Sequence, residues 1–282
     1  MENWSTEGKT LLITGATSGI GLAGAKILSK NGANLILTAR EDERGDKALR
    51  EVFKYSKNNN IELFGCDLAS FESISNFVDK LAEKTKKIDI LINNAGIWEP
   101  SFKVTVDGIE SNFAVNHLGP YLLTNLVLKK FKKTDVERII NTASEAHRGV
   151  YLNLDDIEMK NNFSGYRAYS QSKLANILFT KKLANLLRAD HITVNCFHPG
   201  VVRTHLFDRL NIVQHTVFSP FLIPPKRGAE TMVYLASSPD ISEVTGEYFN
   251  KKKLARPSIE ANNEGVADQL WKISYNYVKS YL

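Results

Sequence analysis

Short apolar runs alternate with longer segments of helical periodicity through most of the chain. Six runs carry apolar residues on both faces, as strands of a parallel sheet do when helices cover both sides. These runs are residues 10–14, 34–38, 61–65, 88–92, 138–142 and 192–197. The helical patterns between them cover residues 19–30, 42–55, 71–84, 108–130 and 165–187. This alternation predicts an α/β fold, a single doubly wound domain of the Rossmann type.

The regular alternation stops after the sixth apolar run. Residues 206–225 are apolar and irregular, and three prolines in the second half prevent one continuous helix. A helix is expected at 226–237, a seventh strand within 244–250 and a closing amphipathic helix from residue 261. We therefore expect one domain over residues 1–282, in which residues 206–237 form a substrate-covering segment. A dimer contact and a patch that rests on a membrane surface are the alternatives for the apolar stretch.

Composition narrows the class of protein but does not identify it. The 282 residues are 43% hydrophobic and 24% charged, which is ordinary globular usage. The net charge of +5 comes from lysines scattered over predicted helices and loops, which favours a solvated basic surface over a nucleic-acid site. Cys66 and Cys196 lie in predicted buried strands, so we expect neither a disulfide nor a metal site.

The sequence offers no signal for secretion or for a membrane span. Residues 1–9 are polar, unlike the apolar core of a signal peptide or an N-terminal anchor. No run of about 18 apolar residues occurs. We expect a cytoplasmic protein, and the sequence leaves a homodimer open.

A glycine-rich turn joins the first predicted strand to the first predicted helix. Residues 14–21 read TGATSGIG. Glycines at this place let the main chain turn sharply and approach a pyrophosphate, which then lies at the helix N-terminus. A glycine-rich turn without a ligand is the alternative, but the strand-turn-helix context favours a dinucleotide site.

The end of the second strand bears on the choice of dinucleotide. A site for NAD usually places an acid here to bind the ribose 2′-hydroxyl, whereas this chain has Arg40. A guanidinium can pair with a 2′-phosphate through two hydrogen bonds, which favours NADP(H). The alternative is a solvated loop charge, since Glu41 and Asp42 follow directly.

Further candidates follow the next strands. Asp67 ends the third strand and could accept a hydrogen bond from adenine, although an aspartate there could also be a helix cap. The sequence NNAG at residues 93–96 ends the fourth strand, and its amides and close-approach glycine could line the cofactor ribose and stabilise the sheet. The carboxyl ends of parallel strands are where open α/β sheets bind ligands.

Tyr169 and Lys173 lie four residues apart in a predicted helix, which places the phenol and the ammonium on one face. A tyrosine pKa of about 10 is too high for a base at neutral pH. A cation at about 4 Å in an effective dielectric of about 20 contributes roughly 4 kcal/mol, and we expect it to lower the phenol pKa by up to about three units. Taken alone, this spacing is common in helices.

Three other features accompany the Tyr–Lys pair. Ser144 follows the fifth strand, where it could hold a substrate oxygen, and Asn116 falls inside a predicted helix, where asparagine has poor propensity. A water held at Asn116 could connect Lys173 to solvent. The turn HPGVVRT at residues 198–204 leaves the sixth strand and is suited to docking the nicotinamide carboxamide.

Together these motifs resemble the short-chain dehydrogenase/reductase family over nearly the whole chain, and most closely its retinol dehydrogenase-like branch. The stretches at residues 116–127, 198–204, 245–249 and 262–273 are similar to that branch. The resemblance implies a mostly parallel seven-stranded sheet in the order 3-2-1-4-5-6-7. It also implies a catalytic tetrad of Asn116, Ser144, Tyr169 and Lys173. The candidate cofactor-binding residues are Gly15, Ser18, Gly19, Ile20, Gly21, Arg40, Asp67, Leu68, Asn93, Ala95, Gly96, Tyr169, Lys173, Pro199, Gly200, Val202 and Thr204.

The expected activity is NADP(H)-dependent hydride transfer at a carbonyl or alcohol carbon of a small hydrophobic substrate. Tyr169 would exchange the proton, Ser144 would hold the same oxygen, and Lys173 would orient the nicotinamide ribose. Two alternatives remain open: a non-catalytic NADP(H)-binding sensor or scaffold, and reduction of a carbon–carbon double bond on the same fold.

Overall fold

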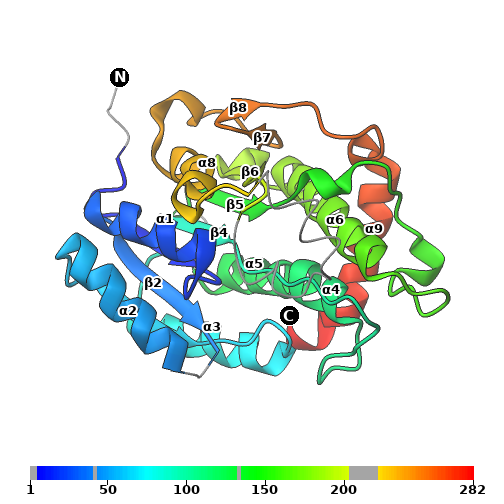
Figure 1. Cartoon of the computed structure of the whole chain (residues 1–282), viewed down its shortest axis with the longest axis horizontal. Coiled ribbons are helices and arrows are strands. Elements are labelled where there is room, and N and C mark those ends of the chain that lie inside the picture. Colours follow the sequence, from blue (N-terminus) through cyan, green and yellow to red (C-terminus); the bar gives the residue numbers. More distant parts are fainter. Residues whose placement is uncertain (1–4, 41–42, 132–134, 203–221) are drawn as a thin grey trace.

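The apolar runs form one continuous sheet at the centre of the protein (Figure 1). The structure is a computed structural model that describes residues 5–40, 43–131, 135–202 and 222–282. The strands are β1 Thr10–Ile13, β2 Asn34–Ala39, β3 Ile61–Gly65, β4 Ile90–Asn93, β5 Arg138–Thr142, β6 Thr193–His198, β7 Tyr248–Asn250 and β8 Lys253–Leu254. Their order is β3-β2-β1-β4-β5-β6-β7-β8, so the expected order is confirmed. The expected count of seven strands was one short, because the two-residue β8 pairs antiparallel with β7.

Helices cover both faces of the sheet. They are α1 Gly19–Lys30, α2 Glu43–Ser56, α3 Phe71–Lys84, α4 Ser111–Phe113, α5 Gly119–Lys130, α6 Gly165–Leu186, α8 Pro225–Ser237 and α9 Glu264–Val278. Successive strand residues point to opposite faces. Leu11 and Ile13 pack with α1 and α8, whereas Leu12 packs with the cluster of α3, α5 and α6. Every strand residue of β1 from Leu11 onward is therefore buried, which explains the uninterrupted apolar runs.

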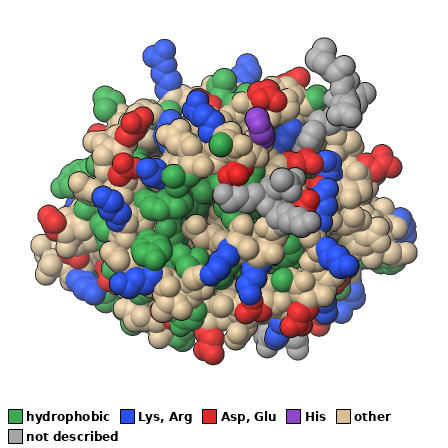
Figure 2. Space-filling model, turned by 180° about the vertical axis from the view of Figure 1, so that it is seen from behind, with side chains coloured by type: hydrophobic (Ala, Val, Ile, Leu, Met, Phe, Trp, Pro, Cys, Tyr) green, Lys and Arg blue, Asp and Glu red, His purple; other side chains and the backbone are tan. Residues whose placement is uncertain are grey.

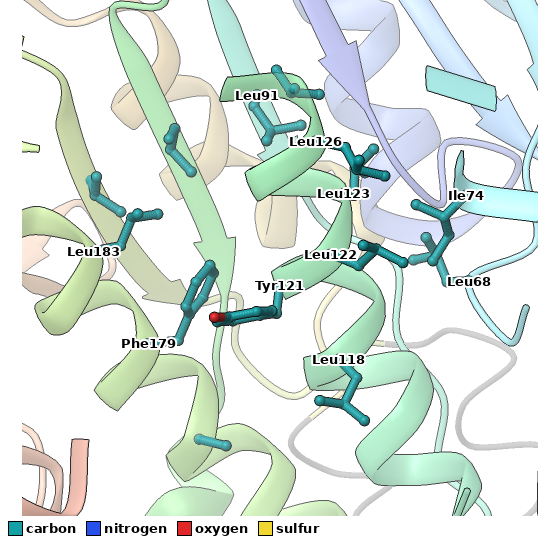
Figure 3. Packing of buried hydrophobic residues seen from close by; sticks show 14 of the residues in the cluster. Leu68, Ile74, Leu91, Leu118, Tyr121, Leu122, Leu123, Leu126, Phe179 and Leu183 are labelled. Carbon is teal, nitrogen blue, oxygen red and sulfur yellow. The ribbon is translucent and has the colours of Figure 1, made fainter. Parts of the chain in front are cut away.

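The layer that contains α5 and α6 has an aromatic centre. Figure 3 shows Tyr121 on α5 facing Phe179 on α6, with Leu118 and Leu122 along the same helix. The ring centroids of Tyr121 and Phe179 are 5.5 Å apart, and Trp271 of α9 lies 4.9 Å from Tyr121. Fully burying one such side chain is worth about 1.5–3 kcal/mol. The closing helix α9 is thus part of the core.

The expected helix over residues 108–130 was wrong in its detail. It begins at Ser111 and changes to a π-helical turn, η1, over Ala114–Leu118 before α5 continues. Pro120 explains part of the break, because it has no N–H to donate to the carbonyl of Asn116 four residues earlier. Such π-turns are frequent at functional sites.

Figure 2 shows the opposite side of the molecule, where lysine, arginine and acidic side chains are interspersed around a group of exposed hydrophobic side chains.

Within the described residues, no helix combines the length and apolar character needed to cross a bilayer. Residues 206–221 of the expected covering segment lie outside the described residues. The described residues before and after this segment are connected by a hydrogen bond, in which the N–H of Ile223 donates to the carbonyl oxygen of Val201 at 2.8 Å.

Candidate active site

The β1–α1 turn leaves no room for a side chain at its first and last glycines. Gly15 has a φ of +65°, and a β-carbon added there would lie 2.7 Å from the Cα of Ala95. A β-carbon at Gly21 would lie 2.2 Å from the carbonyl oxygen of Gly15. Ser18 is the N-cap of α1 but makes no side-chain cap bond, and the first turn holds no acidic residue. The N–H groups that begin α1 are therefore suited to an anionic ligand such as a pyrophosphate.

Neighbouring asparagines at the end of β4 face different surroundings. The amide of Asn94 donates to the carbonyl oxygens of Thr14 (2.9 Å) and Gly15 (3.1 Å), which holds the glycine-rich turn against β4. Asn93 is 3% exposed and donates to Thr124 of α5 and to Asn141 of β5. The side chain of Asn93 thus stabilises the sheet, and only its main chain could face a cofactor.

The residues expected near the adenosine end lie along the same edge of the sheet. Arg40 directly follows β2 and is exposed. Asp67 follows β3 by two residues, and its Oδ1 accepts the N–H of Ala69 at 3.0 Å. Leu68 is buried against the core. The Asp67 carboxylate is therefore partly used in a local turn, while Arg40 is accessible to a ligand.

The turn after β6 completes this edge. Gly200 has a φ of +90°, and a β-carbon added there would lie 2.7 Å from Cδ1 of Ile223. Pro199 is partly exposed and Val202 is buried. Thr204 lies outside the described residues.

Ser144, Tyr169 and Lys173 come together at the carboxyl end of β5. The side chain of Ser144 acts on the phenol of Tyr169 and lowers its pKa, against the larger effect of burial. Nζ of Lys173 lies 5.5 Å from the centre of the Tyr169 ring. Tyr169 and Lys173 both come from α6, one turn apart, as their spacing predicted. These three side chains form a compact group that could hold one oxygen of a substrate.

The expected lowering of the phenol pKa is wrong for the chain without ligands. Burial raises the pKa of Tyr169 to about 12, and the bond to Ser144 opposes this only in part. Burial also lowers the pKa of Lys173 to about 8, so the ammonium is itself destabilised. Both groups are taken out of water, so each loses the hydration that stabilises its charged form.

Lys173 fits a hydroxyl-bearing ligand. Its side chain is 3% exposed, and across the described ranges its one hydrogen bond is a long one, 3.4 Å to the carbonyl oxygen of Thr142. An ammonium has three donor hydrogens. A β-carbon at Gly96 would lie 3.2 Å from this Nζ, so the glycine leaves room beside it. Ribose hydroxyls would supply the acceptors that this buried cation lacks, and the residues present therefore fit a nicotinamide dinucleotide.

Asn116 connects the chain after β4 with helix α6 through hydrogen bonds. Its Oδ1 accepts the N–H of Ile97 at 2.8 Å, and its Nδ2 donates to the carbonyl of Ile97 and to Ser172 Oγ, both at 2.9 Å. Both amide hydrogens are used inside the protein. A water relay at Asn116 would therefore have to use the second Oδ1 lone pair or the main chain. The π-turn also lets the next residue, His117, reach Asn176 on α6.

Three residues near the site were not identified from the sequence: Trp98, Glu145 and His147. Trp98 has its ring centroid 6.5 Å from that of Tyr169. Its position two residues after the NNAG motif was the available signal. His147 and Glu145 surround the main chain of Ser144, and only their proximity to Ser144 in sequence could have suggested them.

A parallel sheet in this order, a glycine-rich β1–α1 turn and a Ser–Tyr–Lys group at its carboxyl edge define a class of dinucleotide-binding α/β oxidoreductases. The family model for short chain dehydrogenase matches residues 9–214. The chain belongs to the short-chain dehydrogenase/reductase family, in its retinol dehydrogenase-like branch.

Relatives and solved structures agree with this placement. Human retinol dehydrogenase 13 is 40% identical over 280 residues, which cover 96% of this chain and 85% of that protein. The chloroplastic short-chain dehydrogenase TIC 32 A of Brassica napus is 38% identical, with 96% of this chain and 89% of that protein covered. A crystal structure of an uncharacterized protein from Mycobacterium paratuberculosis has a TM-score of 0.79 at 30% identity, covering 99% and 96% of the two chains. The 3-ketoacyl-(acyl-carrier-protein) reductase from Brucella melitensis, solved with NADH, has a TM-score of 0.69 at 27% identity, covering 87% and 97%.

Proposed function

We propose that this oxidoreductase uses NADP(H) and reduces the carbonyl group of a small hydrophobic aldehyde or ketone, such as a retinal-like molecule. The observation that carries the proposal is the Ser144–Tyr169–Lys173 group beside Gly96. It combines two hydroxyl donors for one oxygen with a buried cation whose one hydrogen bond among the described residues is 3.4 Å long. The relatives named retinol dehydrogenase support the choice of an apolar substrate.

The residues of the chain have separate tasks in this proposal. Ser144 and Tyr169 donate hydrogen bonds to the substrate oxygen, and Tyr169 passes its proton to that oxygen as negative charge develops there. Lys173 holds the nicotinamide ribose, and Asn116 keeps the loop at Ile97 against α6. The bound nicotinamide supplies the hydride. A phenol whose pKa is raised remains protonated at neutral pH, which suits a proton donor in the direction of reduction.

The choice of NADP(H) rests on Arg40. Its exposed guanidinium follows β2, where an acid would repel a 2′-phosphate. The choice of an apolar substrate also rests on Trp98, whose ring centroid lies 6.5 Å from that of Tyr169. Residues 206–237 as a substrate-covering segment stay a prediction.

The direct test is a substrate panel followed at the nicotinamide absorbance. Purified protein is mixed with NADPH or NADH and with nonanal, benzaldehyde, a methyl ketone or all-trans-retinal, and an enone tests double-bond reduction. We expect oxidation of NADPH with the larger apolar aldehydes. No turnover with any carbonyl, together with tight NADPH binding, would favour the non-catalytic alternative.

A cytoplasmic location and self-association are separate proposals. Self-association rests on exposed apolar side chains such as Ile259 and Leu254, and the cytoplasmic location remains a prediction. A fluorescent fusion expressed in cells and light scattering of the purified protein test them independently of activity.

A further inference from the structure

Ser144 is presented by a single tight turn. It is the N-cap of the 3-10 helix η3, Glu145–His147, and its Oγ accepts the N–H of Ala146 at 3.2 Å. Because one lone pair of Oγ accepts this N–H, the hydroxyl hydrogen points away from the N–H of Ala146. The orientation of the Ser144 hydroxyl therefore depends on the turn staying closed.

His147 closes this turn twice. Its main-chain N–H donates to the carbonyl oxygen of Ser144 at 3.1 Å, and its Nδ1 lies 2.6 Å from the same oxygen. The side chain is 0% exposed. Its other ring nitrogen, Nε2, accepts the N–H of Ser258 at 3.0 Å. A nitrogen that accepts an N–H carries no proton, so the proton of the neutral ring lies on Nδ1 and is donated to Ser144.

The surroundings hold this arrangement from three elements. The ring of His147 packs edge-on against Tyr248 of β7, with centroids 5.2 Å apart. Nδ1 of His198, at the end of β6, accepts the N–H of Glu145 at 3.2 Å. Arg148 donates to the carbonyl of Arg256 at 2.6 Å, next to the Ser258 contact. The chain after β8 is thus bonded to the turn at two places.

We propose that His147 is a positioning residue for Ser144: its neutral imidazole couples the Ser144 carbonyl to the main chain at Ser258 and so sets the direction of the Ser144 hydroxyl. The ring of His147 is bonded to Ser144 and Ser258, so its effect on the reaction passes through Ser144. The proposal rests on the proposed function of Ser144. It makes the segment after β8 a support of the active site, although that segment lies more than 100 residues from Ser144 in sequence.

Three variants separate the two bonds of the ring. His147→Asn retains an N–H donor near the position of Nδ1 and loses the contact with Ser258. His147→Gln can place its Oε1 near the position of Nε2, where it accepts from Ser258, and leaves no donor at the position of Nδ1. His147→Phe retains the ring contact with Tyr248 and loses both bonds. Tyr277→Phe, which removes a part-buried hydrogen bond of 2.8 Å to Glu158, is the control for a general loss of stability.

We expect the Gln and Phe variants to lose about tenfold or more in kcat for nonanal, because a misplacement of about 1 Å costs up to about 100-fold. Their KM for NADPH stays near the parent value, and the Asn variant recovers most of the kcat. Tyr277→Phe lowers Tm without changing kcat. A kcat that is unchanged in the Gln variant, or that falls equally in the Asn and Gln variants, overturns the proposal.

A double-mutant cycle separates this inference from the proposed function. In a Ser144→Ala background, His147→Gln should change kcat by less than about twofold, since its effect passes through Ser144. If Ser144→Ala alone leaves activity intact, the proposed function fails. If Ser144→Ala is damaging and His147→Gln also acts fully in that background, only the role of His147 fails.

A measurement without cofactor completes the test. Hydrogen exchange of the Ala146 and His147 amides reports whether the turn is closed. We expect exchange at least about tenfold faster in the Gln variant and near the parent rate in the Asn variant. Equal exchange in the two variants contradicts the proposal even if no carbonyl in the panel is turned over.

Discussion

Lys173 lies one helical turn after Tyr169, with its Nζ 5.5 Å from the centre of the Tyr169 ring and 3.4 Å from the carbonyl oxygen of Thr142. The cation is thus held between the phenol and β5 in a position from which water is largely excluded. Burial raises the pKa of Tyr169 and lowers the pKa of Lys173, so it favours the neutral form of both groups.

Replacing Tyr169 by Phe should abolish turnover while NADPH binding remains nearly intact, because only the oxygen that transfers the proton is removed. Ser144→Ala should lower kcat by about 100-fold or more, as the loss of a donor to a developing oxyanion does. Tyr166→Phe is the matched control, since Tyr166 lies on the same helix and is 56% exposed. Steady-state kinetics and fluorescence titration with NADPH measure both quantities. Retained activity in Tyr169→Phe would contradict the role of the phenol.

Lys173→Met should make the ligand-free protein more stable at pH 7 and inactive. The pKa of Lys173 is lowered from 10.5 to about 8, and about 2.5 pKa units correspond to about 3 kcal/mol as an upper limit. The folded chain binds fewer protons than the unfolded chain between about pH 8 and pH 10.5. The parent should therefore gain stability as pH rises through this window, and the Met variant should not show that gain.

Urea unfolding at pH 7 and pH 9.5 measures this difference, with Lys129→Met as the control for an exposed lysine on α5. The advantage of Lys173→Met over the parent should shrink at the higher pH. A variant that is less stable than the parent at both pH values would show that the ammonium is not a cost to folding.

Arg40→Ala should raise the KM for NADPH by about 10- to 100-fold and leave the KM for NADH nearly unchanged, because one charge-assisted phosphate contact is worth about 1.5–3 kcal/mol. Arg50→Ala removes an exposed charge from α2 without touching the end of β2, and should affect neither KM. Equal use of the two cofactors by the parent would reject the assignment of NADP(H).

Gly15→Ala should lower both Tm and the affinity for NADPH. An alanine at a φ of +65° costs about 1–2 kcal/mol, and its β-carbon would also lie 2.7 Å from Cα of Ala95. Gly8→Ala is the control, because Gly8 has a φ of +70° with no atom within 4 Å of an added β-carbon. Calorimetry should therefore show a much larger loss for Gly15→Ala. Equal losses would show that close packing at the turn is unimportant.

Local patterns in the sequence determined the architecture and most of the candidate site. Runs that are apolar on both faces predicted β1 to β6, since a strand covered by helices on both sides has no polar face. The TGATSGIG turn and the four-residue spacing of Tyr169 and Lys173 were equally informative, because a turn and a helix face depend on residues close in sequence. The retinol dehydrogenase-like resemblance of the motifs is confirmed by the comparisons.

Tertiary structure decided what depends on burial and on distant partners. The sequence could not tell that Asn93 faces Asn141 within the sheet while Asn94 holds Thr14 and Gly15. It also predicted the wrong direction for the Tyr169 pKa, since desolvation depends on how many elements close over the phenol. The contact of His147 with Ser258 joins segments 111 residues apart, and only the folded chain brings a ring nitrogen and a main-chain N–H to 3.0 Å.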